Sequence, residues 1–230
     1  MRRALARGVL LVALCAGAAG ARAQMPDILD LYREMQIARG DGFPTYEITE
    51  QDGAATASGG VLYGARARVA ATLDRPQFYL RIDDAGDGEG ASSFVTEFVM
   101  WLDPEGFPLV GLSERAVTAG TPFAGRLRFY SRASDRWNLV TREVFPALDE
   151  RVCGTPPQDV DESTTAWEGL GEAVALLPRT GTDIEFWCVG KSPAAGTGMR
   201  VQWDRLRGRF TASERLAGPP PWPDGAPPGR

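Results

Sequence analysis

An acidic, glycine-rich segment has the residue types that could bind a metal ion. Residues 83–90 read Asp-Asp-Ala-Gly-Asp-Gly-Glu-Gly, with four carboxylates and three glycines between two strand-like segments. Ca²⁺ prefers oxygen ligands from a flexible loop, and glycine permits tight turns. Asp84, Asp87 and Glu89 are therefore candidate calcium ligands. The alternative is a solvated loop, because Gly86 stands where the usual calcium-loop spacing needs a ligand.

Carboxylates on strand-like segments could support a second kind of chemistry. Two carboxyl groups about 5 Å or about 6.5–9.5 Å apart can hydrolyse a glycosidic bond without histidine. Glu97, Glu114 and Glu143 are the candidates. In an extended strand Glu97 shares a face with Trp101, whose ring could stack on a sugar. The alternative is that these glutamates are ordinary polar positions on a partly exposed sheet face.

Histidine is absent from all 230 residues. This excludes a Ser-His-Asp triad, a Cys-His pair, an HExxH zinc site and any histidine proton shuttle. No motif of an established activity appears in the remaining sequence, and no cofactor is predicted.

The cysteines favour a disulfide in an oxidising compartment. Cys15 belongs to the N-terminal segment described next, which leaves Cys153 and Cys188. Their disulfide would stabilise the fold by about 3–4 kcal/mol in the chain-entropy treatment. A redox pair is the alternative, but the CxxC spacing typical of one is missing.

Residues 1–23 have the pattern of a secretory signal peptide. Arg2, Arg3 and Arg7 precede an apolar run over 8–19, and small residues at 21–23 suit a signal peptidase. The run is too short for a permanent membrane helix, and no second run approaches that length. Leu14 before Cys15 does not fit a lipobox. We therefore expect a periplasmic or secreted protein without a transmembrane segment.

Charge argues against a nucleic-acid partner. The expected signal segment carries four of the 25 basic residues and none of the 30 acidic ones, so its removal leaves a net charge of −9. An acidic surface repels phosphate backbones. Arginines such as Arg81, Arg128 and Arg209 recur on strand-like segments and could clamp an anion, but a solvated sheet face is favoured, because lysine is almost absent and arginine is the usual cation of this chain.

Two helices are expected beside the strands. Pro26-Asp27 starts a helix that ends before Gly40, with Ile28, Leu31, Tyr32 and Met35 on one face. A second helix is predicted over 165–177, where Thr165 and Glu168 suit a capping box.

Most of the chain beyond residue 45 alternates between apolar and polar residues, which predicts half-buried strands. The turn residues 103–106, 134–135 and 208 predict three hairpins around them. The expected fold is mainly β: an antiparallel sandwich or partly closed barrel built from hairpins, with the two helices against it. Residues 24–217 form one domain in this prediction, and the Pro/Gly-rich residues 218–230 form a disordered tail.

About a third of the chain resembles segments of uncharacterised secreted bacterial β-rich proteins. The matching elements are the stretch from Leu127 through Trp137 and Thr141 to Pro146, residues 181–185, and the hairpin from Val201 to Phe210. The resemblance implies an exported β-rich module and transfers neither an activity nor site residues.

The sequence therefore favours an exported, non-enzymatic binding module whose partner is a protein, a glycan or a component of the bacterial envelope. A carboxylate-dependent glycan hydrolase and a calcium-stabilised structural domain are the alternatives.

Overall fold

The computed structural model describes residues 25–39, 43–59, 68–86, 92–118, 121–133, 136–145, 153, 173–189, 194–218 and 220. The expected signal peptide and nearly all of the expected tail lie outside these residues. Among the described residues, no helix combines the length and apolar character needed to span a bilayer.

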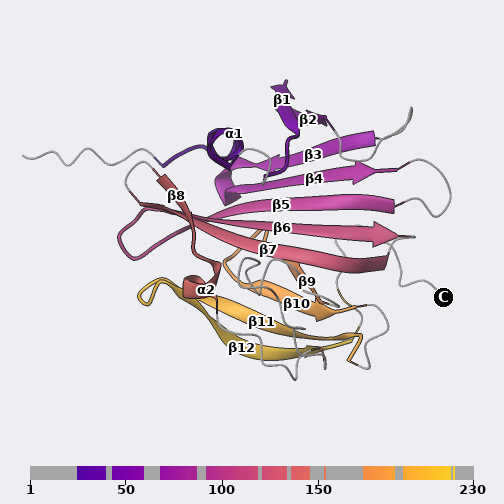
Figure 1. Ribbon diagram of the computed structural model, residues 1–230, viewed down its shortest axis with the longest axis vertical. Coiled ribbons are helices and arrows are strands. Elements are labelled where there is room, and N and C mark those ends of the chain that lie inside the picture. The colour runs from indigo at the N-terminus through magenta and orange to yellow at the C-terminus, as the bar shows by residue number, and fades with distance from the viewer. Residues whose placement is uncertain are drawn as a thin grey trace, which may run out of the picture.

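The fold is mainly β, as expected, with two antiparallel sheets and an N-terminal helix (Figure 1). Helix α1 is followed by the strands of an eight-stranded sheet, a short helix α2 and the strands of a four-stranded sheet. In chain order the elements are α1 (Ile28–Arg39), β1 (Glu47–Gln51), β2 (Ala54–Ser58), β3 (Arg68–Asp74), a 3₁₀ turn (Arg75–Gln77), β4 (Tyr79–Ala85), β5 (Ser92–Leu102), β6 (Pro108–Thr118), β7 (Thr121–Ala133), β8 (Arg136–Leu139), α2 (Thr141–Val144), β9 (Ala173–Leu176), β10 (Ile184–Cys188), β11 (Thr197–Asp204) and β12 (Arg209–Ala217).

The large sheet is a meander in which each strand pairs with the next along the chain. Its longest hairpin, β5–β6, turns at residues 103–107, where the Gly106 N–H donates to the Asp103 carbonyl (3.1 Å). Gly106 has a φ of +90°, a conformation that suits glycine. The small sheet has the order β12-β11-β10-β9, so neither sheet closes into a barrel within the described residues.

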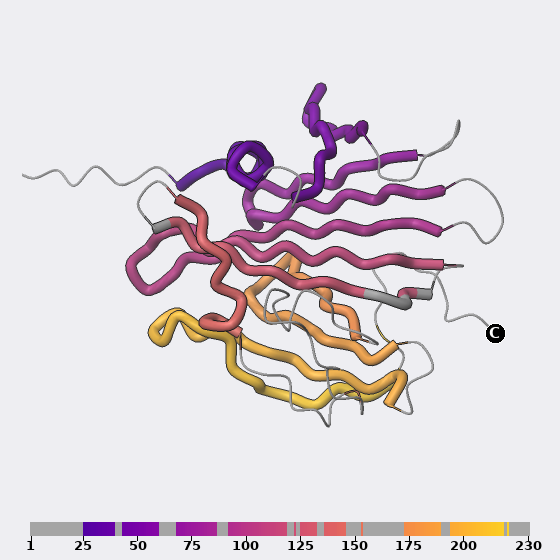
Figure 2. The backbone as a smooth tube through the Cα atoms, in the orientation of Figure 1, coloured from indigo at the N-terminus to yellow at the C-terminus, as the bar shows by residue number. Residues whose placement is uncertain are grey.

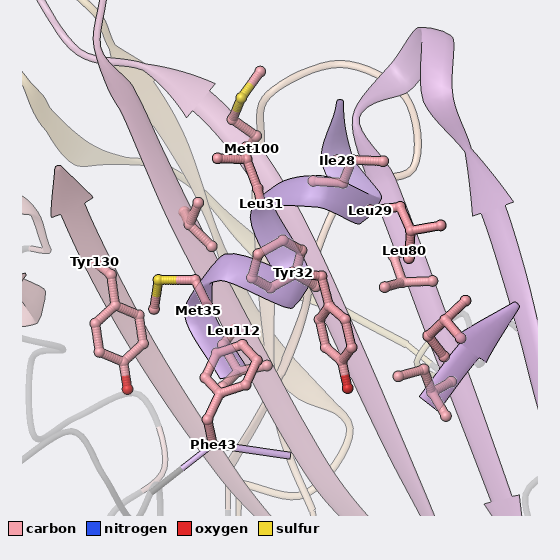
Figure 3. Close-up of a cluster of buried hydrophobic side chains, with 14 of the residues drawn as sticks. Ile28, Leu29, Leu31, Tyr32, Met35, Phe43, Leu80, Met100, Leu112 and Tyr130 are labelled. Atoms are coloured by element: carbon pink, nitrogen blue, oxygen red, sulfur yellow. The ribbon is translucent and has the colours of Figure 1, made fainter. Parts of the chain in front are cut away.

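Helix α1 covers one face of the large sheet. The Asp27 carboxylate accepts the Leu29 N–H (2.9 Å), which caps the first turn. The helix buries Ile28, Leu31, Tyr32 and Met35, as the spacing predicts, against apolar side chains of strands β4–β7 (Figure 3).

The small sheet covers the opposite face of the large sheet. The core between the sheets joins Val99, Trp101 and Phe129 of the large sheet to Phe186 and Phe210 of the small one. Val95–Trp101 of β5 are therefore buried throughout. The prediction of half-buried strands is wrong for this centre, because a second layer covers the face that was expected to be exposed.

The two sheets also meet at their hairpin turns. The β5–β6 and β11–β12 turns lie at the same end of the molecule (Figure 2), and the Trp203 indole N–H donates to the Leu102 carbonyl (3.1 Å). A Cβ at Gly208 would lie 3.1 Å from the ring of Pro104. These contacts fix one end of the small sheet against the large one.

The predicted helix over 165–177 is wrong where the structure describes it. Ala173–Leu176 form strand β9, are all buried and pair with β10. A short apolar run of this kind fits a buried strand as well as a helix, so periodicity cannot decide between them. Residues 165–172 lie outside the described part of the chain.

The predicted disulfide between Cys153 and Cys188 is confirmed, with the two Cα atoms 5.3 Å apart. Cys188 is the last residue of β10, so the bond attaches Cys153 to the small sheet.

Close approach of the two sheets depends on Gly125 in β7. A Cβ there would lie 2.9 Å from the Ala173 carbonyl oxygen and 3.2 Å from the Val174 Cα. We predict that Gly125→Ala lowers the free energy of unfolding by about 1–3 kcal/mol, because β9 must move away from β7. Urea unfolding checks this, and Gly125→Val should cost more than Gly125→Ala; equal stability of all three proteins would contradict it.

The cap of α1 predicts a pH-dependent contribution to stability. Burial opposes the charge on Asp27, but hydrogen bonds from Arg75 and Leu29 outweigh it and lower the pKa of Asp27 below 3.8. A lowered folded-state pKa stabilises the fold fully above pH 3.8, and this contribution is lost as the pH falls through the folded-state pKa.

Asp27→Ala should therefore lower the free energy of unfolding by about 1 kcal/mol at pH 7, and this loss should become smaller as the pH falls below 3.8. Urea unfolding of both proteins at several pH values measures this difference. Asp30→Ala, at the exposed first turn of the same helix, is the control and should have little effect. A cost for Asp27→Ala that stays constant down to pH 2.5 would contradict the assignment.

Candidate functional site

A cleft of about 720 Å³ lies where the small sheet meets strands β3–β5 of the large sheet. One wall carries Thr72, Arg81 and Asp83 of the large sheet. The small sheet and the residues just before β10 contribute Asp183, Glu185 and Arg200, together with the segment 176–180 that leaves β9. Tyr79 and Glu97 line the cleft but are almost fully buried, so they form its floor.

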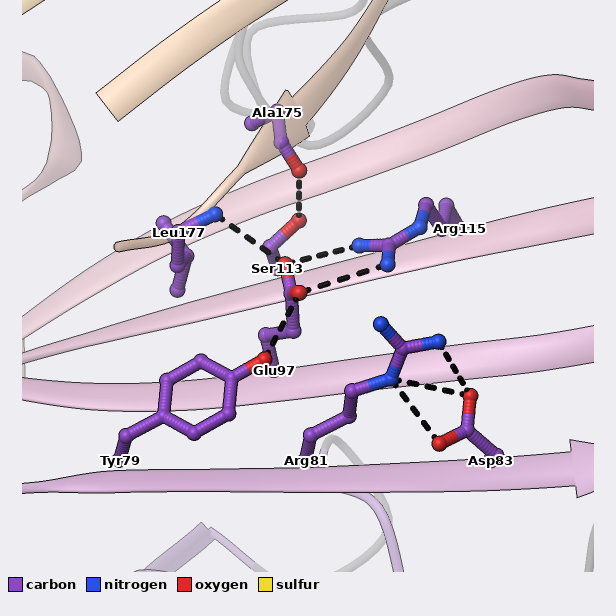
Figure 4. A network of polar contacts seen from close by, with 8 residues as sticks. All are labelled: Tyr79, Arg81, Asp83, Glu97, Ser113, Arg115, Ala175 and Leu177. Carbon is purple, nitrogen blue, oxygen red and sulfur yellow. Dashed lines mark hydrogen bonds and ion pairs between the residues drawn. The ribbon is translucent and has the colours of Figure 1, made fainter. Parts of the chain in front are cut away.

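Glu97 is the centre of the floor. Its carboxylate accepts four hydrogen bonds: from the Tyr79 hydroxyl (3.0 Å), from two nitrogens of Arg115 (2.8 and 3.3 Å) and from the Leu177 N–H (3.1 Å) (Figure 4). Glu97 and Arg115 are 1% and 2% exposed. A buried ion pair is tolerated only when its remaining lone pairs are also satisfied, and this carboxylate meets that condition.

Strand register brings these groups together. Arg81 lies opposite Glu97, and Glu97 lies opposite Ser113, so the three form one row across β4, β5 and β6. The Ser113 hydroxyl donates to the Ala175 carbonyl (2.7 Å), and the Leu177 N–H reaches Glu97. The row therefore attaches the chain at the end of β9 to the middle of the large sheet.

The Tyr79 hydroxyl stays protonated in this setting. Burial and then the negative charge of Glu97 raise the pKa of Tyr79 far above 10.0. Tyr79 is therefore a hydrogen-bond donor to Glu97 at any physiological pH and not a proton-transfer group.

Ion pairs occupy the walls. Arg81 donates to both oxygens of Asp83 (2.6–3.0 Å). Arg200 donates to Glu185 (2.8 Å) and to Glu214 (2.6 Å), and these bonds, Glu185 first, raise the pKa of Arg200. The walls thus present fixed donors and acceptors side by side.

Two further charged side chains complete the cleft. Arg179 donates to Asp74 (3.0 Å) across the end of β3. Asp183 accepts a hydrogen bond from the Gln202 amide (3.2 Å) and one from the Thr182 hydroxyl (3.3 Å). Asp183 is half-buried and lines the cleft, where its charge also interacts with that of Arg200.

The three glutamates considered for hydrolysis are not brought together. Glu97 points to the small sheet. Glu114 directly follows Ser113, the register partner of Glu97 in β6, so it points to the opposite, α1 side, where it pairs with Arg128. Glu143 is exposed in α2 rather than on a strand. Of the three, only Glu97 lines the cleft.

Trp101 is placed differently from the expectation that it stacks on a ligand. It is 4% exposed, lies against Phe129 and Phe210, and donates its indole N–H to the Thr182 carbonyl (3.1 Å). Its ring fills the core between the sheets, which corrects that expectation, because no ring face is open to a sugar.

The predicted calcium loop lies mostly outside the described residues, which include neither Asp87 nor Glu89. Asp84 is fully buried in β4 and accepts the Tyr46 hydroxyl (3.1 Å) on the α1 side of the sheet. Within the described ranges no group of three or more candidate metal ligands is found.

Most of the cleft was missed by sequence reasoning. Tyr79, Arg115 and Arg200 are separated by up to 121 positions, and only the register of two sheets brings them to one place. The signal available in advance was charge inside apolar strands: Glu97 and Arg115 interrupt runs that are otherwise suited to a core.

No family model, curated protein or solved structure matches this chain.

The buried pair predicts a large loss of stability when one partner is removed. Glu97→Gln should lower the free energy of unfolding by about 3–5 kcal/mol, because Arg115 would remain charged and buried without its carboxylate. Urea unfolding measures the effect.

The matched control is Glu34→Gln. Glu34 of α1 pairs with Arg132 at the surface, where both side chains are more than one third exposed. Glu34→Gln should therefore lower the free energy of unfolding by less than about 1 kcal/mol. The double variant Glu97→Leu with Arg115→Leu should be more stable than Glu97→Gln, because no unpaired charge remains. Equal costs for Glu97→Gln and Glu34→Gln would contradict this account.

Proposed function

We propose that this protein is an exported binding module, without catalytic activity, that holds a polar ligand in the cleft between its two sheets. The observation that carries this proposal is the cleft itself, in which charged side chains from strands far apart in sequence converge on one cavity.

The size and position of the cleft support a ligand site. Small-molecule sites commonly have volumes of about 300–1,000 Å³, and this cleft falls within that range. Its floor is held by Glu97 and its donors, so the cleft has a fixed shape before any ligand arrives. A preformed cavity lowers the ordering cost of binding.

The state of the carboxylates favours binding over hydrolysis. A general acid or base must exchange a proton with the substrate, and a nucleophile must reach it. Glu97 is saturated with donors, and Asp83 and Glu185 are each tied to an arginine. Asp183, the fourth carboxylate of the described lining, accepts hydrogen bonds from Gln202 and Thr182. Groups held in this way suit recognition through hydrogen bonds.

Export is supported by the signal-like residues 1–23 and by the disulfide. Disulfides form in oxidising compartments, which for a bacterial envelope protein means the periplasm or the medium.

A small-molecule screen on the purified protein tests the proposal. Neutral oligosaccharides, amino acids, short peptides, nucleotides and fatty acids would each be added, and the melting temperature and amide NMR shifts followed. We expect at least one class to raise the melting temperature and to shift the amides of residues 176–185. Asp183→Asn and Arg200→Gln should abolish the effect, because both side chains face the cleft.

Arg132→Gln is the matched control, since Arg132 is as exposed as Arg200 but pairs with Glu34 beside α1. It should leave binding unchanged. Ligand shifts confined to other parts of the molecule would overturn the cleft as the site. Turnover of the bound compound, lost on changing one cleft carboxylate, would overturn the non-catalytic assignment.

A further inference from the structure

We infer that the cleft takes a neutral carbohydrate, an inference that rests on the proposed function and names its ligand class. Three features of the cleft support a neutral sugar: paired charges on its walls, hydrogen-bonding groups exposed there, and few apolar side chains.

The charges disfavour an anionic ligand. Each arginine in the described part of the lining forms an ion pair with a carboxylate: Arg81 with Asp83, Arg179 with Asp74 and Arg200 with Glu185. A phosphate or carboxylate would have to displace one of these acids and approach Asp183 as well. Each such step costs electrostatic energy, and truly anion-binding sites instead offer arginines in excess over acids.

An apolar ligand is disfavoured for a different reason. The walls are formed by ion pairs that are partly in contact with water, and covering them with hydrocarbon would remove that water without replacing its hydrogen bonds. The described apolar lining is confined to Leu176, Leu177 and Pro178 at one side.

Sugar hydroxyls match the paired guanidinium and carboxylate groups that the walls present. A hydroxyl both donates and accepts, so it can bond to a guanidinium and to the neighbouring carboxylate without separating the pair. Neighbouring hydroxyls on a sugar ring can engage the planar edge of a carboxylate or guanidinium in two parallel hydrogen bonds, as other bidentate partners do. Asp183 adds a carboxylate that accepts hydrogen bonds from the Gln202 amide and the Thr182 hydroxyl and also interacts electrostatically with Arg200.

The inference also predicts how such a ligand is held. With Trp101 and Tyr79 buried, no described aromatic ring lines the cleft with an open face. Binding should therefore depend on hydrogen bonds and should be largely insensitive to salt, since the ligand carries no charge.

Calorimetric titration with matched saccharides tests this. The probes are a neutral disaccharide and trisaccharide series built from glucose and from N-acetylglucosamine, together with the corresponding uronic acids and sugar phosphates. We expect a neutral member to bind, with its affinity changed less than twofold between 50 and 500 mM NaCl. Each anionic counterpart should bind at least tenfold more weakly.

Variants connect the binding to the cleft. Asp183→Asn should weaken the neutral sugar at least tenfold, and Arg132→Gln should leave it unchanged; a melt of each variant shows that it is folded. Anionic sugars binding more tightly than neutral ones would overturn the inference. A peptide or amino acid that binds with the same dependence on Asp183, while no sugar does, would overturn the inference and leave the proposed function standing. If no probe binds while the protein is folded, both the carbohydrate inference and the proposed binding function are overturned.

Discussion

The buried carboxylate of Glu97 is the constraint on which the arrangement of the two sheets depends. A charge that is 1% exposed must be matched by nearby donors, and the Tyr79 hydroxyl, Arg115 and the Leu177 N–H supply them. The first two come from the large sheet and the third from the chain that leaves β9. Satisfying this carboxylate therefore fixes where the small sheet lies, and the cleft is the space left beside that contact.

Burial of the large sheet on both faces explains why such a polar group is tolerated. Helix α1 covers one face and the small sheet covers the other, so the middle of β5 is buried on both faces. A core made only of apolar side chains would allow the small sheet to slide, because apolar contacts have little directionality. Hydrogen bonds from Ser113 and Leu177 select one position, and Gly125 permits the close approach that this position needs.

Much of the fold could be predicted from local patterns. The 3.6-residue spacing of Ile28, Leu31, Tyr32 and Met35 identified α1, and turn residues identified the β5–β6, β7–β8 and β11–β12 hairpins. The site could not be predicted, because it depends on the register between strands and on the packing of one sheet on another. Strand alternation predicts the shared face of Glu97 and Trp101 but not the second sheet that covers this face. Ala173–Leu176 are too few residues to show a period.

Hydrogen exchange at the Leu177 amide tests the central claim most directly. Leu177 follows the last residue of β9, and the described structure protects its N–H through Glu97. If this contact fixes the small sheet, the amide should exchange as slowly as the amides at the centre of β5, through the same cooperative opening. Exchange as rapid as that of the exposed residues 179–182 would contradict the account, because the sheets would then be separating at this point without unfolding.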